Sequence, residues 1–436
     1  TGWDTDPVWD GGEQWRFLST GDLSVRYVFI GDSLNLGAQV LKALPANNYG
    51  NNTGWDTDPV WDGGGVTNDW SDDDNWDTGA APISTDTVTF DGTSTKNATV
   101  DAAFGGTIAI FNINSGYTGT ITLARSLTVT GTFSQADGTL DLTAFNASTG
   151  AMTMTGGLLS GSSGVLTSTS YGVQSGTISA ILGGAGALTK SGTGTVTLTR
   201  ANTYTGATAV TAGVLNIQNA NATGTTAGGV SVTSGAVLEI QGGISVGAET
   251  LTLNGSGISN GGALRNVSGD NTWGGTVTRG SAARINSDSG TLTIAGTSGG
   301  NFNLTVGGAG NTALEGVISG TSVGIIKDGS GTLSVSALNT YTGATTVSAG
   351  VLRVLHARGT GTTAGGVTVA SGAAIELQGG IAVGAESLTL NGTGIASDGA
   401  LRSLSGTNSW SGAITRGSAV RINTDADTLT LSGTMG

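Results

Sequence analysis

Cysteine is absent from this chain of 436 residues, and histidine occurs once, as His356. Without thiols the chain has neither a disulfide framework nor a thiolate metal site. Proline is scarce, with four residues, and the 78 glycines follow no three-residue period, which excludes a collagen helix. No apolar run reaches the roughly 18 residues that a membrane-spanning helix needs, so we expect no membrane span in this chain.

Charge is also sparse. Charged residues make up 11% of the chain, and the formal net charge is −14. An acidic surface repels phosphate backbones, so we expect no nucleic acid partner. Disordered chains are rich in charge and poor in Val, Ile and Leu, whereas hydrophobic residues reach 37% here. The composition therefore predicts a folded core built with few aromatic residues.

A long internal repeat dominates what the sequence does contain. The segment that begins at Gly192 recurs at Gly329, and the same offset of 137 (341 − 204) relates Tyr204 to Tyr341. The two copies span about 186–300 and 323–436 and align without a gap over more than about a hundred residues. Such repeats are typical of chains that stack on themselves. They favour a scaffold over an enzyme, because a catalytic site is normally built once.

From residue 83 onward, short segments alternate apolar and polar side chains, with glycine, asparagine or serine between them. This pattern predicts an all-β fold. In the segment TVTLT, we expect Val196 and Leu198 to point inward and Thr197 outward. A 137-residue unit is longer than a propeller blade of roughly 40–50 residues and suits about six coils of a parallel β-helix. At roughly 20–25 residues per coil and about 4.8 Å between coils, the rod would be on the order of 70–80 Å long.

Composition divides the chain into three parts: an N-terminal cap or assembly arm (1–52), a Trp/Asp/Gly-rich entry segment (53–82) and a β-solenoid (83–436). The first part is irregular or mixed, and a short apolar face that includes Leu41 predicts a helix there that Pro45 ends. The second part opens with twelve residues that copy residues 1–12 letter for letter. Because the chain starts with Thr and stops within a repeat, we expect it to be part of a longer precursor.

The segments 186–218 and 325–354 resemble the autotransporter-associated β-strand repeat, also called the passenger-associated transport repeat. The resemblance rests on a Gly-Thr-Val strand from Gly194, the Asn-Thr-Tyr-x-Gly motif at 202–206 and a Gly-x-Leu strand from Gly213. It implies a right-handed parallel β-helix, secreted and placed outside the cell or on the outer surface of a Gram-negative-type bacterium. It also implies a stalk, adhesin or matrix component.

One segment points to catalysis instead. Residues 27–34, YVFIGDSL, resemble the first block of GDSL esterases, which implies Ser33 as a nucleophile. A serine hydroxyl needs a base, usually histidine held by a carboxylate. The single histidine, His356, has Arg353 where that family carries aspartate, and it replaces Asn219 of the first copy. We therefore interpret Ser33 as part of a structural strand and turn, and expect no enzyme.

The entry segment offers a weak metal candidate. Asp72, Asp74 and Asp77 provide the carboxylate oxygens that calcium prefers, but not the spacing of a known calcium loop. We expect a solvated acidic turn and no cofactor, with calcium as the alternative.

The repeated tryptophans Trp3, Trp9, Trp55 and Trp61 are candidates for self-association, because the duplicated dodecamer lets one chain occupy a site already filled within another. Stacking on sugars and closing the end of a coil are the alternatives for these rings. Unpaired strand edges at the end of a β-helix template pairing with another chain. Head-to-tail contacts that do not close give filaments.

Two repeated charged positions complete the candidates. Glu239 and Glu376 alternate with apolar neighbours and are predicted to point outward, and Lys190 and Lys327 are predicted to lie in solvated turns. Together the sequence predicts a secreted structural or adhesive solenoid whose partner is a second copy, a host or neighbouring cell surface, or a polysaccharide. The alternative is a carbohydrate-binding or carbohydrate- or ester-cleaving β-helix.

Overall fold

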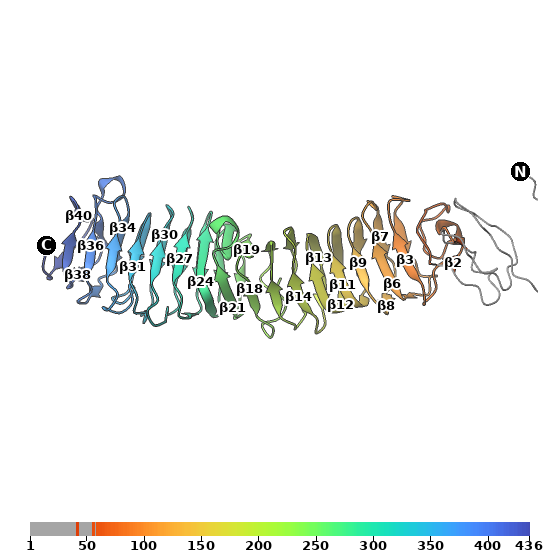
Figure 1. The fold of residues 1–436 in the computed structure, drawn as a ribbon, viewed down its shortest axis with the longest axis horizontal. Coiled ribbons are helices and arrows are strands. Elements are labelled where there is room, and N and C mark those ends of the chain that lie inside the picture. Colours follow the sequence, from red (N-terminus) through yellow and green to blue (C-terminus); the bar gives the residue numbers. More distant parts are fainter. Residues whose placement is uncertain (1–40, 43–54, 57) are drawn as a thin grey trace, which may run out of the picture.

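The computed structural model describes residues 41–42, 55–56 and 58–436. These residues form a long rod whose strands run across its axis (Figure 1). The paired strands are all parallel, and the fold is a parallel β-solenoid of about 16 turns, as the sequence predicts. At roughly 4.8 Å per turn, the rod is on the order of 75–80 Å long. Helical structure in the described part is limited to three 3-10 turns, η2 (Asp73–Asn75), η3 (Ile258–Asn260) and η4 (Ile395–Ser397).

Each turn of the solenoid carries three strand positions, which the chain visits in a fixed order and which we name faces A, B and C. Strands on one face pair only with strands of the turns above and below. Four long strands bend around a corner and serve more than one face. They are β11 (Ala147–Met154), β12 (Leu158–Val173), β13 (Gly176–Gly183) and β24 (Val277–Ser287).

Face A begins at the N-terminal end of the rod. It comprises β3 (Thr87–Phe90), β6 (Ile110–Ile113), β9 (Phe133–Gln135), β14 (Ala187–Lys190), β16 (Thr208–Val210), β18 (Val230–Val232), β21 (Leu251–Gly255) and β26 (Ser298–Gly299). Chain order places three further strands on it, β35 (Ala382–Val383), β38 (Asn408–Trp410) and β41 (Leu429–Leu431).

Face B runs the full length of the solenoid. It comprises β4 (Ala98–Val100), β7 (Thr120–Leu123), β10 (Thr139–Asp141), β15 (Thr195–Leu198), β17 (Val214–Ile217), β19 (Val237–Gln241), β22 (Leu264–Ser268), β27 (Leu304–Gly307), β29 (Ile325–Lys327), β31 (Thr345–Val347), β33 (Val367–Val369), β36 (Leu388–Leu390) and β39 (Ile414–Arg416).

Face C completes each turn. It comprises β5 (Thr107–Ile108), β8 (Leu127–Val129), β20 (Ser245–Val246), β23 (Asn271–Trp273), β25 (Thr291–Ile294), β28 (Asn311–Leu314), β30 (Thr332–Val335), β32 (Val351–Val354), β34 (Ala374–Gln378), β37 (Leu401–Ser405) and β40 (Ile422–Thr424).

The core lies inside the three faces and follows the predicted alternation. In β15, Val196 and Leu198 are fully buried, whereas Thr195 faces solvent. One coil leaves its apolar side chains open at both ends, and the neighbouring coils cover them, so the core is one continuous cluster along the rod.

Coil length varies along the rod. Register partners on face B lie 19 residues apart at Thr120 and Thr139 (139 − 120), and partners on face A lie 26 apart at Leu251 and Val277 (277 − 251). The loop that contains η3 accounts for the longer coil.

The internal repeat is rotated about the rod axis. Strand β14 lies on face A, but β29, its equivalent 137 residues later, stacks on β27 and lies on face B. In the same way, β17 lies on face B, and its equivalent β32 lies on face C. The repeat therefore advances six turns and one further face. The sequence predicts about six coils but not the remainder.

The N-terminal region begins with β1 (Leu41–Lys42) and β2 (Trp55–Asp56), which pair in parallel. The helix predicted around Leu41 is wrong at these two residues, which form an extended strand. The rest of that prediction lies outside the described residues.

Candidate functional site

Part of the sequence-predicted site lies outside the described residues. Ser33, Trp3 and Trp9 are among the residues not described. Trp55 lies in β2, of which only the backbone is described. The predictions for these residues lie outside the part of the chain that the structure describes and stay predictions.

Trp61 lies in the core at the N-terminal end of the rod. Its ring packs against Trp76 and Phe90 at centroid distances of 5.1 and 5.3 Å, and its indole N–H donates to the Lys96 carbonyl. Trp70 joins the same cluster and is fully buried. This arrangement matches the alternative in which the tryptophans close the end of a coil. The self-association role of Trp61 stays a prediction.

The acidic loop is organised by its own backbone. Asp72 accepts hydrogen bonds from the amide and hydroxyl of Thr67, which hold the pKa of Asp72 below its usual value. Asp74 lies within the short turn η2, and its amide donates to the capping side chain of Asp72. Asp77 accepts from the Val60 amide at 2.9 Å.

A lysine ammonium fills the centre of this loop. Lys96 Nζ donates to the carbonyls of Gly63, Gly65 and Thr67 and to Asn75 Oδ1, at 2.6–3.1 Å. Across residues 58–436 and the two short strands before them, no group of three or more His, Asp or Glu residues is placed to hold a metal ion. Calcium binding stays a prediction, and it would have to compete with the ammonium for these oxygens.

Lys190 and Lys327 lie inside the rod, so the prediction of solvated turns is wrong for both. Lys190 stacks between Val173 and Val210 in one inward-facing file on face A, and Lys327 between Val306 and Val347 on face B. Both residues are at most 2% exposed. A sequence signal was available, because period-two alternation puts Lys190 on the same side of its strand as the buried Leu188.

Each buried ammonium bonds the backbone of two coils. Lys327 Nζ donates to the carbonyls of Asp328 (2.6 Å) and Gly329 (2.8 Å) on its own turn and to Ala349 (3.2 Å) on the next. Lys190 makes the equivalent three bonds, to Ser191, Gly192 and Ala212. Burial lowers the pKa of both lysines, to about 8 for Lys327. We call each of these two residues a lysine staple.

The glycine of the Gly-x-Leu strand is part of the same arrangement. Gly213 has φ +63°, and a Cβ there would lie 2.5 Å from the Gly192 carbonyl oxygen and 2.8 Å from Lys190 Nζ. Only glycine fits at this corner without displacing the staple.

Tyr204 and Tyr341, the central residues of the Asn-Thr-Tyr-x-Gly motif, are buried in the core. The hydroxyl of Tyr341 shares a hydrogen bond of 2.7 Å with the hydroxyl of Thr345, which donates to the Thr360 carbonyl of the next coil. Tyr204 forms the same bond with Thr208. Burial raises the pKa of both tyrosines.

A buried glutamate lies near each tyrosine, and the sequence analysis did not identify either. Glu249 and Glu386 are repeat-equivalent, are each 2% exposed, and have one carboxylate oxygen without a hydrogen-bond partner. The other oxygen of Glu386 accepts from the Thr360 hydroxyl. Burial raises the pKa of both carboxyl groups to about 7.

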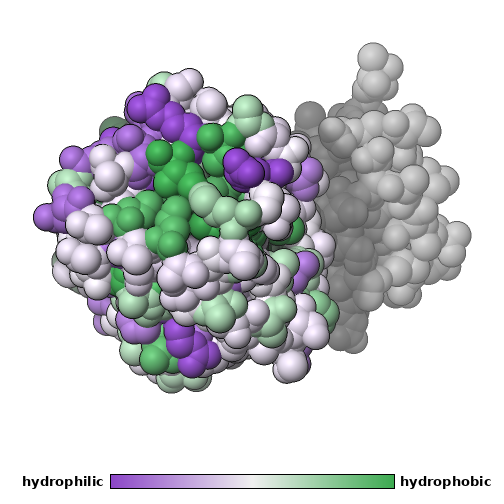
Figure 2. Space-filling model, turned by 90° about the vertical axis from the view of Figure 1, so that its left-hand side faces the viewer, coloured by the Kyte–Doolittle hydropathy of each residue, from purple (hydrophilic) through white to green (hydrophobic). Residues whose placement is uncertain are grey.

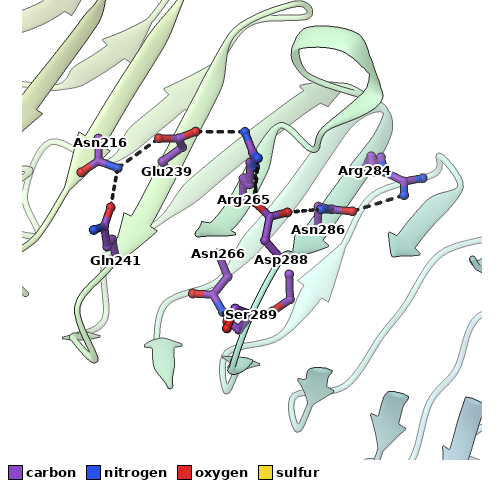
Figure 3. A network of polar contacts seen from close by, with 10 residues as sticks. Asn216, Glu239, Gln241, Arg265, Asn266, Arg284, Asn286, Asp288 and Ser289 are labelled. Atoms are coloured by element: carbon purple, nitrogen blue, oxygen red, sulfur yellow. Dashed lines mark hydrogen bonds and ion pairs between the residues drawn. The ribbon is translucent and has the colours of Figure 1, made fainter. Parts of the chain in front are cut away.

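Glu239 lies on the outer side of face B, as predicted, in a network that spans four successive coils (Figure 3). Arg265 bridges Glu239 at 3.3 Å and Asp288 at 2.6 Å, and Asn216 donates to Glu239 from the preceding coil. Opposite charges on successive coils attract one another along the rod. The network therefore links coils and leaves the Glu239 carboxylate engaged.

Glu376 occupies the equivalent network on face C. Arg353, which replaces Asn216 in this copy, lies 2.9 Å from Glu376, and Arg402 bridges Glu376 (3.6 Å) and Asp425 (2.5 Å). Each glutamate is thus paired with arginine within its own copy, on a different face from its equivalent.

Arg279 is a further internal cation that the sequence analysis missed. It is 1% exposed and donates to the Phe302 carbonyl, Ser298 Oγ and the carbonyls of Gly300 and Ser319. Burial lowers its pKa to about 10. It joins three consecutive coils through bonds to their backbone and side chains, much as the two lysine staples join two coils each.

His356 faces the chain's own backbone. Its Nδ1 accepts a hydrogen bond of 3.1 Å from the Arg358 amide. With Ser33 outside the described residues, the structure shows no serine–histidine pair within the part it describes, and the hydrolase alternative stays untested.

Repeated buried polar groups that bond one coil to the next define a repeat protein of the β-solenoid class. The passenger-associated transport repeat matches residues 188–217 and 325–354, which contain the two lysine staples and the two buried tyrosines. This finding confirms the resemblance seen in the sequence at both places. No curated protein and no solved structure matches the chain.

These findings fit a secreted passenger region of the autotransporter type. No helix in the described part of the chain is long and apolar enough to cross a membrane.

Proposed function

We propose that this chain is an extracellular structural rod of a bacterial cell surface, in which the solenoid itself performs the function. The observation that carries the proposal is the placement of both transport repeats inside one uninterrupted stack of coils. The polar side chains that define the repeats are buried and form bonds between coils, so they are not placed to act on a substrate.

The proposal extends to head-to-tail association. The C-terminal coil presents an apolar centre ringed by polar residues (Figure 2), to which Ile422, Leu429 and Leu431 contribute as partly buried side chains. Strands β40 and β41 each pair on one side only. A face of this kind matches another coil of the same type, whether that coil belongs to a second copy or to further residues of the same chain.

The interior of the rod supports this idea. Arg279 and Arg416 are repeat-equivalent, and Arg279 holds the coil that follows it through four acceptors. Arg416 has an exposed position and one bond from its Nε, to the Gly436 carbonyl. Arg416 would bond the carbonyls of the coil that follows, which in a filament would come from a second copy if the chain itself supplies none.

Electron microscopy of the purified chain across a concentration series tests the proposal, with sedimentation measured in parallel. We expect rods at low concentration and uniform filaments at high concentration. Ile422→Glu should shorten the filaments, because it places a charge in the apolar face. Phe302→Glu, at an exposed position on the side of the rod, is the matched control and should leave them unchanged. Single rods at every concentration would contradict self-association and leave the rod as a stalk.

A further inference from the structure

A polar groove lies on the side of the stack where β12 pairs with β13 through a shift in register. Their register runs from Ser160↔Ser179 to Val165↔Ile181, so β12 contains three more residues than β13 over this stretch. The extra residues, 161–164, form a bulge within β12, which we call the loop. Beneath it lies a groove of about 530 Å³ on the outer side of the rod, in the yellow part of Figure 1.

The walls of the groove come from four successive coils, and every side chain in them is polar. The lining includes a carboxylate, a guanidinium and a series of hydroxyls, contributed by Asp141, Thr143, Ser160, Ser162, Ser179 and Arg200.

The backbone holds the groove in one shape. Thr143 has φ +51°, an uncommon conformation for a β-branched residue, and its carbonyl accepts the amides of Ser162, Ser163 and Gly164. Its hydroxyl donates to the Leu123 carbonyl at 2.8 Å. The loop is therefore fixed before any ligand arrives, which lowers the entropic cost of binding.

The two charged residues are held by the same loop. Arg200 Nη1 donates to the Gly161 carbonyl at 3.0 Å across two coils, and Asp141 Oδ1 accepts from the Thr143 amide at 2.9 Å. Arg200 has further N–H donors, and Asp141 a second carboxylate oxygen. The groove thus offers donors and acceptors of both charges within one open site.

We propose that this groove binds a neutral oligosaccharide. Vicinal sugar hydroxyls both donate and accept, so they match a wall that combines a carboxylate, a guanidinium and hydroxyls. An anionic ligand would meet Asp141 and a chain of net charge −14, and a cationic ligand would meet Arg200. The inference does not depend on head-to-tail association.

The second copy of the repeat lacks the key residue of this groove. Arg200 corresponds to Ala337 (200 + 137), although the flanking asparagines keep the same role. Asn202 Oδ1 accepts from the Leu182 amide and Asn339 Oδ1 from the Ile318 amide, both at 2.8 Å. The fold therefore tolerates alanine at this corner, so Arg200→Ala is expected to leave the coil intact.

The test uses the full chain and neutral tetrasaccharides, namely cellotetraose, maltotetraose and mannotetraose, with tetragalacturonate as the charged comparison. Saturation-transfer NMR detects binding, and calorimetric titration measures it. We expect at least one neutral tetrasaccharide to bind with a Kd of about 0.1–1 mM, as suits a shallow polar site. Tetragalacturonate should bind more weakly.

Arg200→Ala should weaken the binding about tenfold, the scale expected when a hydrogen bond to a charged group is lost. Asp141→Asn should weaken it similarly, while the amide oxygen keeps the bond to Thr143. Arg358→Ala, which removes the same charge from an exposed position in the second copy, is the matched control and should bind as the unchanged chain does.

Circular dichroism and thermal unfolding establish that each variant is folded. The proposal is overturned if no neutral tetrasaccharide binds at about 10 mM, a concentration well above the expected Kd. It is also overturned if only tetragalacturonate binds, or if folded Arg200→Ala and Asp141→Asn both bind as tightly as Arg358→Ala. Loss of filaments with intact sugar binding would count against head-to-tail association alone.

Discussion

At the scale of single residues, the rod depends on charged groups placed where the sequence pattern calls for apolar ones. The ammonium of Lys327 satisfies three carbonyls that would otherwise face an apolar file between Val306 and Val347. A buried carbonyl without a donor is costly. The lysine is thus a structural residue of the transport repeat, because it replaces the water that a solvated corner would use.

Lys327→Met should therefore destabilise the chain, by about 2–3 kcal/mol, because the slightly shorter apolar side chain fits the file but leaves the carbonyls unpaired. The measurement is the denaturant midpoint by circular dichroism. Lys190→Met should have a similar effect. Arg358→Ala, at an exposed position, should change the free energy of unfolding by less than about 0.5 kcal/mol. Equal midpoints for Lys327→Met and the unchanged chain would mean that the ammonium bonds contribute nothing net.

The buried glutamates predict a pH dependence. Burial raises the folded-state pKa of Glu249 and Glu386 to about 7, above the 4.5 of an exposed glutamate. The folded state then binds more protons than the unfolded state between pH 4.5 and 7, so stability falls as pH rises through this window. We expect the free energy of unfolding, measured by denaturant titration, to be lower at pH 8 than at pH 5. The difference should be up to about 3 kcal/mol per group.

Glu386→Gln and Glu249→Gln together should flatten that dependence, because the amide does not titrate. Glu315→Gln, outside the two buried sites, should leave it intact. A midpoint that rises between pH 5 and 8 in the unchanged chain would contradict the prediction.

The sequence predicts which side chains point inward, but it does not predict the acceptors that the buried lysines bond. Alternation correctly places Val196 and Leu198 inside and Glu239 outside. It also places Lys190 inside, but a lysine before a glycine turn is usually solvated. The third acceptor of Lys190, the Ala212 carbonyl, lies on the next coil, and no local pattern reveals it.

At the scale of elements, the strands are held to one another by polar bonds between coils as well as by backbone ladders. Arg279 is the clearest example, since its guanidinium joins β24 to the segments around Phe302 and Ser319. The parallel ladder alone fixes neighbouring turns, whereas this arginine reaches a turn further.

Arg279→Met should lower the free energy of unfolding, measured by denaturant titration, by about 2–4 kcal/mol. The substitution leaves buried acceptors on two coils without donors. Arg416→Met, at the repeat-equivalent but exposed position, is the matched control and should change it by less than about 0.5 kcal/mol. A similar effect of both substitutions would mean that the loss of stability reflects removal of a positive charge and not the loss of bonds between coils.

The identity of the elements was predictable, but their assignment to faces was not. Short alternating segments and glycine corners predict a parallel stack with roughly 20–25 residues per coil. Register partners on neighbouring coils lie from 16 residues apart, at Val165 and Ile181 (181 − 165), to 28 apart, at Gly255 and Ala283 (283 − 255). Because loops such as the one around η3 add residues without adding a strand, counting residues does not reveal where a repeat lands on the rod.

At the scale of the whole molecule, the rotation of the repeat is directly testable. The structure pairs Thr305 with Ile326 on neighbouring strands of face B. If the second copy of the repeat began on face A like the first, Ile326 would instead lie on face A, in the row of stacked residues that contains Gly299. Neighbouring parallel strands lie about 4.8 Å apart, within the range in which two cysteines form a disulfide.

The pair Thr305→Cys and Ile326→Cys should therefore form a disulfide under mild oxidation, whereas Gly299→Cys with Ile326→Cys should not. The chain has no cysteine of its own, so thiol titration and mass spectrometry of the digested protein give an unambiguous count. Formation of the second disulfide and not the first would contradict the rotated arrangement.

The rotation determines how a surface made of such repeats connects to its surroundings. Equivalent networks around Glu239 and Glu376 point about a third of a turn apart, as three faces per turn require. One partner held against one side of the rod therefore cannot engage both copies at once, so the second copy adds no avidity for it. Two partners on different sides can each engage one copy. For partners that bind at repeat-equivalent positions, tandem repeats built in this way would make the rod a cross-linking node. A longer chain would then join more neighbours instead of holding one of them more strongly.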